Sequence, residues 1–301
     1  MTEQTSAMMT IAICTADRPV DLERCVESLR AELQGAKRPC EILIIDNTPT
    51  GTAATMAQRL AERTPVPMRH VIEPRRGLSA ARNRAVREAR GELIAFLDDD
   101  IQVRPGWAAA IAAAFEETDC AAVAGRVLPD FECEPPAWIL REDLVTLGRL
   151  DLGGGRRPVT GHELLGCNFA VVRTWCDRVG GFREDLGRVG SSGFAGEETD
   201  LALRIAAAGG AIVYCPDATV RHRVRAGELR RSRQLLRAYW GGRTAQRIAR
   251  GSAQSEAAAP EARPAISRFF ARRAAGRTLF AEALHAAWLV GRRAERLLGN
   301  G

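Results

Sequence analysis

Residues 92–100 constrain the fold more than any other part of the 301-residue chain. Apolar residues at 93–97 run directly into three aspartates, which is typical of a buried strand that ends at an acidic edge. Adjacent carboxylates repel one another and are costly to bury, and an oxygen-preferring divalent cation removes that repulsion. We therefore expect Asp98, Asp99 and Asp100 to hold a metal-bound nucleotide at the carboxyl edge of an α/β sheet. A solvated acidic turn is the alternative that this segment leaves open.

The composition bounds the class of protein. The length permits one large domain, or one domain with an appendage, and 46% hydrophobic residues are ample for a core. No run reaches the ~18 consecutive apolar residues of a spanning helix, and residues 1–5 do not resemble the start of a secretory signal. The eight cysteines form no CxxC pair, which argues against a zinc site and a disulfide scaffold. We expect a cytoplasmic protein with reduced thiols.

Charge is unevenly spread along the chain. From Arg221 onward there are 18 Arg against 5 acidic residues, whereas the first 220 residues hold 25 basic and 32 acidic ones, which together give the net +6. A basic tail on an acidic body suggests contact with lipid head groups or a phosphorylated substrate. Nucleic acid is not expected as a partner, because the Arg-rich part contains no recognisable binding module.

Strand and helix patterns alternate over residues 9–124, which predicts parallel βαβ units with helices on both faces of a sheet. The expected strands are 9–15, 41–45, 68–72, 92–97 and 121–124, and the expected helices are 20–33, 52–63, 78–86 and 106–117. Ligands of such sheets bind beyond the carboxyl ends of the strands. Polar residues follow three of these ends, at 15–18, 46–47 and 98–100, and we expect them to converge on one nucleotide cleft.

The regular alternation breaks over residues 128–161, which contain several prolines and a run of three glycines. A long irregular insertion is usually disordered or functional, and its apolar and aromatic residues favour a loop that covers the substrate. After it we expect a strand at 165–172, a short helix at 173–179 and a strand at 211–215.

A second acidic group, Glu197 and Glu198, begins a helical pattern at 197–206. Carboxylates in a first helical turn complement the helix dipole, which is the simple explanation. A carboxylate held near a cleft can also act as general base for an incoming hydroxyl, and the flexible turn at 191–193 favours that role. His222 lies among arginines beyond a strand, so it is either a structural or surface histidine or a metal ligand beside Asp100.

In this order and spacing, these segments resemble the family 2 inverting glycosyltransferases, which have the GT-A nucleotide-sugar fold. The matching segments are Thr15 and Arg18 after the first strand, Ile45-Asp46-Asn47, GLSAARN at 77–83, FLDDD at 96–100, GEETDL at 196–201 and His222. FLDDD alone is moderately specific, but its spacing with the motifs before and after it is strongly so. The resemblance covers residues 9–225.

The resemblance implies a role for each residue that holds the donor. Asp46 is expected at the base of the nucleotide, with Thr15 and Arg18 lining the same pocket. Arg82 and Asn83 are expected to help hold the nucleotide or the sugar.

The resemblance also implies a metal site and a base. Asp98 is expected to contact the ribose or the metal, and Asp99 to help bind the donor. Asp100 is expected to ligate an Mg2+ or Mn2+ that bridges the diphosphate, and His222 to complete the metal site. The family base is the second residue of a Glu-Asp pair. Here Glu198 occupies that position as a glutamate, so Glu197 stays an alternative base.

The implied reaction is a direct displacement with inversion. The base takes a proton from an acceptor hydroxyl, which attacks the anomeric carbon as nucleoside diphosphate leaves. UDP is the expected carrier, although dTDP and GDP fit the same motifs. The acceptor is a glycan, a lipid-linked sugar or a small molecule.

The implied fold is α/β, a GT-A type Rossmann-like mixed, mostly parallel sheet flanked by helices. A catalytic domain is expected at 1–227, with a nucleotide-sugar-binding half at 9–125 and an acceptor-binding half at 126–227. An Arg-rich helical extension is expected at 228–301, with a linker at 252–264 and a basic amphipathic helix beyond it. Three alternatives are open for that helix: it contacts the inner face of a membrane, packs on the catalytic domain, or forms a homodimer.

Two further functions stay open. A nucleotidyltransferase has a similar sheet and acidic metal site, but residues 15–19 are too short and too poor in glycine for its phosphate loop. A nucleotide-binding or membrane-adaptor protein without transfer activity is the non-enzymatic alternative.

Overall fold

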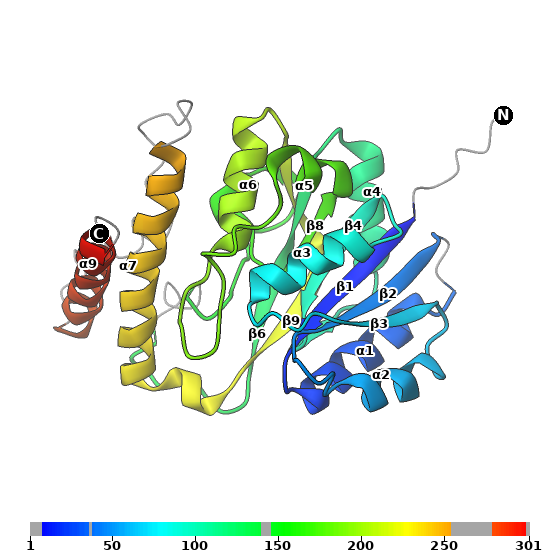
Figure 1. Cartoon of the computed structure of the whole chain (residues 1–301), viewed down its shortest axis with the longest axis horizontal. Coiled ribbons are helices and arrows are strands. Elements are labelled where there is room, and N and C mark those ends of the chain that lie inside the picture. Colours follow the sequence, from blue (N-terminus) through cyan, green and yellow to red (C-terminus); the bar gives the residue numbers. More distant parts are fainter. Residues whose placement is uncertain (1–7, 36–37, 140–145, 254–278, 299–301) are drawn as a thin grey trace.

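The computed structural model describes residues 8–35, 38–139, 146–253 and 279–298, and every structural statement below refers to these residues. They form one mixed sheet with the strand order β3-β2-β1-β4-β8-β6-β9-β5, and β7 pairs with β9 (Figure 1). The strands are β1 Met9–Thr15, β2 Cys40–Asp46, β3 Met68–Ile72, β4 Leu93–Asp98, β5 Ile101–Val103, β6 Ala122–Phe131, β7 Arg157–Pro158, β8 Asn168–Val172 and β9 Ile212–Val224. The α-helices are α1 Pro19–Leu33, α2 Ala54–Ala61, α3 Leu78–Glu88, α4 Trp107–Glu117, α5 Arg173–Val179, α6 Glu197–Ala207, α7 Arg231–Ala253 and α9 Leu279–Leu298.

The first half of the sheet consists of parallel strands. β1 pairs with β2 on one side and β4 on the other, and β3 pairs with β2. All residues of β1 and β2 are buried, as continuous apolar strands between two helical layers should be. The chain passes from β1 through β2 to β3 in one direction along the sheet and then returns to form β4 on the other side of β1. Because such crossovers are right-handed, α1 and α2 cover one face of the sheet and α3 covers the other. The reversal makes the gap between β1 and β4 the point where ligands bind in such sheets.

The second half of the sheet mixes directions. β8 is antiparallel to both β4 and β6, β9 is parallel to β6, and β5 is antiparallel to β9. The expected mixed, mostly parallel GT-A sheet with flanking helices is therefore confirmed. The boundary expected between the two halves of the catalytic domain, at 125/126, falls inside β6, so both halves share one continuous sheet.

Several strands differ from the sequence prediction. β6 runs to Phe131 and β7 lies at Arg157–Pro158, whereas a strand at 121–124 and irregular structure over 128–161 were expected. β9 was expected to end at residue 215 but continues through Pro216 to Val224. Its pairing with β6 shifts register between Gly125 and Val127, and this bulge accommodates the proline. β8 begins at Asn168 rather than at residue 165, since the Asn168 amide donates to the Leu165 carbonyl in a turn (3.1 Å). β5 was not predicted, because three residues are too few for a periodic signal.

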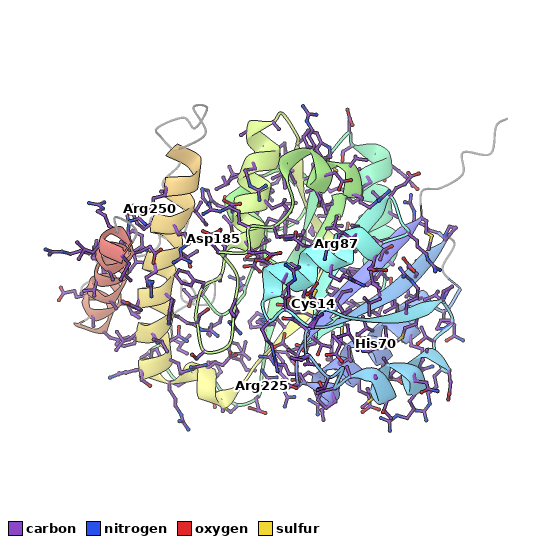
Figure 2. The ribbon with its side chains drawn as sticks, in the orientation of Figure 1. Cys14, His70, Arg87, Asp185, Arg225 and Arg250 are labelled. Atoms are coloured by element: carbon purple, nitrogen blue, oxygen red, sulfur yellow. The ribbon has the colours of Figure 1, made fainter. Side chains whose placement is uncertain are left out.

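The C-terminal helices α7 and α9 pack on each other at the side of the sheet (Figure 1). The two backbones are in direct contact at two glycines. A Cβ on Gly242 of α7 would overlap the Trp288 carbonyl of α9, and a Cβ on Gly291 of α9 would overlap the Tyr239 carbonyl of α7. Arg250 in α7 donates to the carbonyls of Glu295 and Arg296 in α9, at 2.7 Å each (Figure 2). Residues 279–298 therefore pack on α7, within the extension itself, and most of the expected linker lies outside the described residues.

Within the described ranges, no helix combines the length and apolarity that crossing a bilayer requires.

Candidate active site

A cavity of ≈ 650 Å³ opens at the carboxyl ends of β1 and β4. The described residues that line it come from the strand ends, from the first turn of α6, from β9 and from the C-terminal helices. They include Thr15, Arg18, Arg82, Asp98, Asp99, Asp100, Glu197, Glu198 and His222. The aspartates, the glutamates and the late histidine, which lie far apart in the sequence, therefore face one cavity.

Asp99 is held by the end of β1. Its carboxylate accepts a hydrogen bond from the Thr15 hydroxyl (2.7 Å) and pairs with the Arg18 guanidinium (3.1 Å). Asp99 is only 4% exposed, and burial raises its pKa to about 7 even though Arg18 opposes the shift. Thr15 and Arg18 line the cavity and also fix the middle aspartate.

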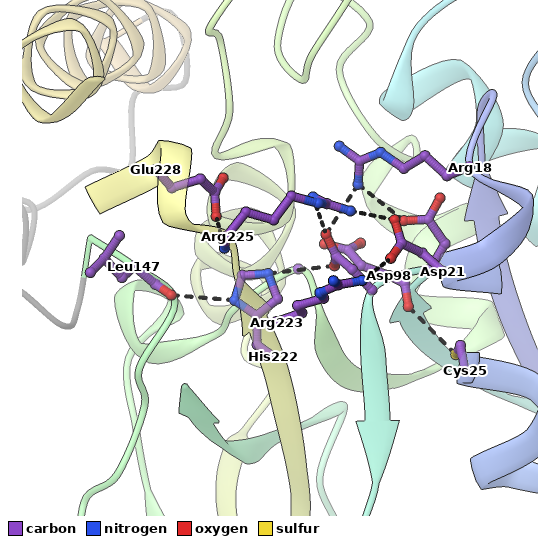
Figure 3. A network of polar contacts seen from close by, with 12 residues as sticks. Arg18, Asp21, Cys25, Asp98, Leu147, His222, Arg223, Arg225 and Glu228 are labelled. Atoms are coloured by element: carbon purple, nitrogen blue, oxygen red, sulfur yellow. Dashed lines mark hydrogen bonds and ion pairs between the residues drawn. The ribbon is translucent and has the colours of Figure 1, made fainter. Parts of the chain in front are cut away.

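Asp100 contacts His222, Arg18 and Arg225, the three partners that are labelled in Figure 3. Its carboxylate is 3.5 Å from His222 Nε2, 3.1 Å from Arg18 and 3.6 Å from Arg225. Burial alone would raise the pKa of Asp100, but these partners lower it, and Asp100 in turn raises the pKa of His222 against the effect of burial. Asp100 is therefore an ionised carboxylate in a cationic surrounding.

The donor types of this region fit a divalent cation. His222 Nδ1 lies 3.3 Å from the Leu147 carbonyl, to which it can donate, and Nε2 faces Asp100, where a bound cation could take the place of a proton. Asp98 keeps one third of its side chain exposed and pairs with Arg82 at 3.2 Å. In the described ranges, no three His, Cys, Asp or Glu side chains stand together as a metal site. Of the expected ligand set, only Asp100 and His222 are already adjacent.

Arg82 joins the two acidic groups from inside the cavity. Its side chain is 3% exposed and pairs with Glu197 and, at 3.2 Å, with Asp98, while it donates to the Gly166 carbonyl at 2.8 Å. Burial would lower the pKa of Arg82, but the carboxylates of Glu197 and Asp98 raise it overall. A Cβ on Gly166 would lie 2.6 Å from Arg82 Nη2, so only glycine leaves room for this arginine.

Glu197 and Glu198 have different surroundings although they are adjacent in the sequence. Glu197 is buried against Arg82, whereas the nearest cationic group to Glu198 is Arg82 Nη1 at 3.9 Å. Burial and the neighbouring Glu197 raise the pKa of Glu198 to about 7, against the opposing charge of Arg82. Glu198 therefore changes its charge near neutral pH while facing the cavity.

Two expected donor-binding residues do not line the cavity. Asp46 is fully buried, and its carboxylate accepts from the Ala53 amide (2.6 Å) and the Thr48 hydroxyl (2.6 Å), so it fixes the turn before α2. Asn83 exchanges two 2.8 Å hydrogen bonds with the backbone of Phe182. Both side chains have their polar atoms engaged in holding neighbouring segments.

Asn47, which the sequence placed at the cleft together with Asp46, lines the cavity and fixes residues 73–77 by accepting from the Gly77 amide (2.8 Å). The structure adds two arginines to which the sequence assigned no role. Arg225 pairs with Asp100 and with Asp21. Arg237 lines the cavity from α7 and pairs with Glu228 at 2.9 Å. Arginines around His222 were visible in the sequence, but only the fold shows that Arg225 is the one beside Asp100.

The strand order, the reversal between β1 and β4, and the acidic strand end at the cavity together define the GT-A class of α/β folds. The sequence profile of Glycosyl transferase family 2 matches residues 10–180. The chain belongs to this family.

Two curated relatives are similar over much of the chain. The Succinoglycan biosynthesis protein ExoM of Rhizobium meliloti is 29% identical over 211 residues, 70% of this chain and 65% of the relative. The Glucosyl-dolichyl phosphate glucuronosyltransferase of Haloferax volcanii is 26% identical over 175 residues, 58% of this chain and 56% of the relative. The matches thus span less than two thirds of either relative's length.

A solved structure shares the fold. The mannosyltransferase PcManGT from Pyrobaculum calidifontis, in complex with GDP-Man and Mn2+, superimposes with a TM-score of 0.64 at 20% sequence identity. The superposition covers 99% of this chain and 89% of that protein. The agreement therefore extends to the C-terminal part beyond the family profile.

Proposed function

We propose that this protein is a metal-dependent, inverting glycosyltransferase that moves a sugar from a nucleoside diphosphate sugar to an acceptor hydroxyl. The observation that carries the proposal is that the aspartates 98–100, both glutamates and His222 line one cavity at the reversal point of the sheet. Family membership and the metal and nucleotide sugar named for PcManGT support the same reaction class.

Glu198 is the proposed general base, in preference to Glu197. The carboxylate of Glu197 is engaged in a buried ion pair with Arg82, whereas that of Glu198 lies 3.9 Å from the same guanidinium. Glu198, with a pKa of about 7, can take the proton of an acceptor hydroxyl near neutral pH. The acceptor oxygen then attacks the anomeric carbon, the bond to the diphosphate breaks, and the configuration inverts.

The donor diphosphate is proposed to lie beside Asp100, where Arg18 and Arg225 supply positive charge. Asp100 and His222 would hold an Mg2+ or Mn2+ there, with Asp98 as the third ligand once donor binding draws it from Arg82. A bound divalent cation neutralises charge on the departing phosphate. Thr15 and Asn47 line the neighbouring part of the cavity and are proposed to contact the nucleoside.

The carrier and acceptor are proposed more specifically as UDP and a lipid-linked sugar. UDP rests on the resemblance of the motifs, whereas PcManGT was solved with GDP-Man, so both belong in the test. The named substrate of the Haloferax volcanii relative, glucosyl-dolichyl phosphate, supports a lipid-linked acceptor. Apolar side chains on the extension side of the cavity, including Ile248 and Leu284, would suit the lipid part.

The extension is also proposed to rest on the inner face of a membrane. On α9, Leu289, Val290 and Leu297 are 47%, 59% and 69% exposed, beside the exposed Arg293 and Arg296. An apolar and basic helix face suits anionic lipid head groups. More protein should co-sediment with anionic phosphatidylglycerol vesicles than with phosphatidylcholine vesicles. Equal amounts with both kinds of vesicle would contradict membrane contact. A dimer that buries α9, detected by light scattering, would also contradict it.

A thermal-shift screen followed by product analysis tests the proposed reaction. With Mn2+ or Mg2+, at least one of UDP-glucose, UDP-glucuronic acid and GDP-mannose should raise the Tm, because ligand binding stabilises the native state. Turnover of that donor should release nucleoside diphosphate. Release of pyrophosphate would favour a nucleotidyltransferase, and metal-dependent binding without turnover on a broad acceptor panel would favour the non-enzymatic alternative.

A further inference from the structure

The loop that leads into the two glutamates is held by α7. The Phe194 ring is 8% exposed and lies under two guanidinium groups, those of Arg243 at 4.8 Å and Arg247 at 3.7 Å from its centroid. Trp240 packs against the same ring, with centroids 4.9 Å apart. Cation–π and aromatic contacts of this kind are directional, so they fix the plane of the ring as well as its burial.

The backbone of the loop lies directly on α7. Gly193 approaches the Trp240 ring so closely that an added Cβ would overlap it. Gly196 has a φ of 83° and precedes Glu197 as the cap of α6, and a Cβ there would lie 2.9 Å from Thr244 Cγ2. The Ala195 amide donates to the Thr244 hydroxyl at 3.4 Å. The position of α7 therefore determines where the first turn of α6 begins.

A carboxylate on α9 holds the two arginines of this contact. The Glu295 side chain is 4% exposed and accepts from Arg243 Nε at 2.9 Å and Arg247 Nε at 2.7 Å. Burial would raise the pKa of Glu295, but the two arginines lower it overall, so the carboxylate is ionised. Arg247 also donates to the Asp185 carbonyl at 2.6 Å, which ties α7 to the segment before the loop.

We propose that Glu295 is a positioning residue for Glu198. The contacts run from Glu295 through Arg243 and Arg247 to Phe194, and from Phe194 along four residues of backbone to the base. The inference rests on the proposed role of Glu198 as base. It gives the C-terminal pair of helices a function in the reaction, although Glu295 itself does not line the cavity.

The first test compares Glu295→Gln with Glu282→Gln in the full-length protein. Glutamine keeps the size of the side chain but removes the charge that holds two guanidinium groups, and Glu282 is an exposed carboxylate in the first turn of the same helix. With the nucleotide sugar selected by thermal shift, and Mn2+, kcat of Glu295→Gln should fall up to about 100-fold, the cost of a misplaced catalytic group. KM for the donor should stay within about twofold, because the donor-binding residues are untouched.

The second test needs no turnover. Hydrogen–deuterium exchange of the amides at 190–198 should be faster in Glu295→Gln than in Glu282→Gln, with exchange at 9–46 unchanged. Unchanged exchange at 190–198 would overturn the proposed contact chain, even if the wild type transfers no sugar and the proposed function itself fails. Faster exchange with kcat equal to that of Glu282→Gln, or a raised KM with kcat unchanged, would overturn the positioning role.

Arg247→Lys provides the same tests if Glu295→Gln does not fold. Lysine keeps the charge but loses the planar group that lies on Phe194 and bonds Glu295. We expect the same loss of kcat with an unchanged KM, together with the same local increase in exchange. A folded Arg247→Lys protein with wild-type kcat and wild-type exchange would contradict the inference.

Discussion

Arg82 and Glu197 form an ion pair in which neither side chain is more than 3% exposed. The arginine comes from α3 and the glutamate from the first turn of α6, so the pair joins the parallel half of the sheet to the acidic helix. Because Arg82 also contacts Asp98, one cation bridges both acidic groups in the cavity. Of the two adjacent glutamates, Glu198 is the one with a raised pKa.

Replacing Glu198 by Gln should remove the base without disturbing the donor. We expect kcat to fall about 100- to 10,000-fold, the usual contribution of general base catalysis, with donor affinity retained. Steady-state kinetics and a calorimetric donor titration measure the two quantities. Full activity in Glu198→Gln would contradict the assignment and move the base to Glu197 or elsewhere.

The rate should depend on pH through the ionisation of Glu198. Only the carboxylate accepts a proton, so kcat/KM should fall about tenfold per pH unit below the pKa of about 7 and level off above it. The residual rate of Glu198→Gln should lack this inflection, whereas an inflection that persists would come from Asp99, whose pKa is also raised to about 7. A plateau that extends down to pH 5.5 in the wild type would show that burial does not raise the pKa of the base.

Replacing Arg82 by Met should lower the free energy of unfolding of the protein. Removing one partner of a buried ion pair leaves Glu197 uncompensated, which typically costs about 3–5 kcal/mol of unfolding free energy. Urea denaturation measures this change. The double variant Arg82→Met/Glu197→Gln should recover part of the loss, and additive effects of the two changes would show that the residues do not interact.

Replacing His222 by Ala should weaken metal binding. The imidazole is held by the Leu147 carbonyl with Nε2 toward Asp100, so its loss should raise the Mn2+ concentration for half-maximal donor binding about 10- to 100-fold. His162→Ala, which removes a second histidine that lines the cavity, serves as a comparison. Equal metal requirements in wild type and His222→Ala would exclude His222 as a ligand.

The sequence predicted the parts of the fold whose signal is local. Continuous apolar runs predicted β1 and β2, and the spacing of Leu22, Val26 and Leu29 predicted α1, because burial on one face follows directly from such patterns. The length of β9 could not be predicted, since the pairing that carries it past Pro216 comes from β6, which is far away in the sequence. Bulges are tertiary features without a sequence period.

The candidate site was predicted as a set of residues but not as a set of pairings. Asp46 ends β2 and Asn47 follows it directly, yet the fold turns Asp46 into the interior and Asn47 toward the cavity. Likewise, the choice between Glu197 and Glu198 depends on Arg82, whose position is set by α3 and by the space above Gly166. Side-chain direction at a strand end depends on neighbouring strands, which the local sequence does not encode.

Anomalous diffraction from crystals grown with Mn2+ and a nucleoside diphosphate tests the central claim most directly, namely that the acidic strand end and His222 hold a metal-bound diphosphate. We predict one strong Mn2+ peak at about 2.0–2.3 Å from Asp100 Oδ1 and His222 Nε2, with the diphosphate beside Arg18 and Arg225. A peak remote from Asp100, or a nucleotide bound in the cavity with no metal near these residues, would contradict it.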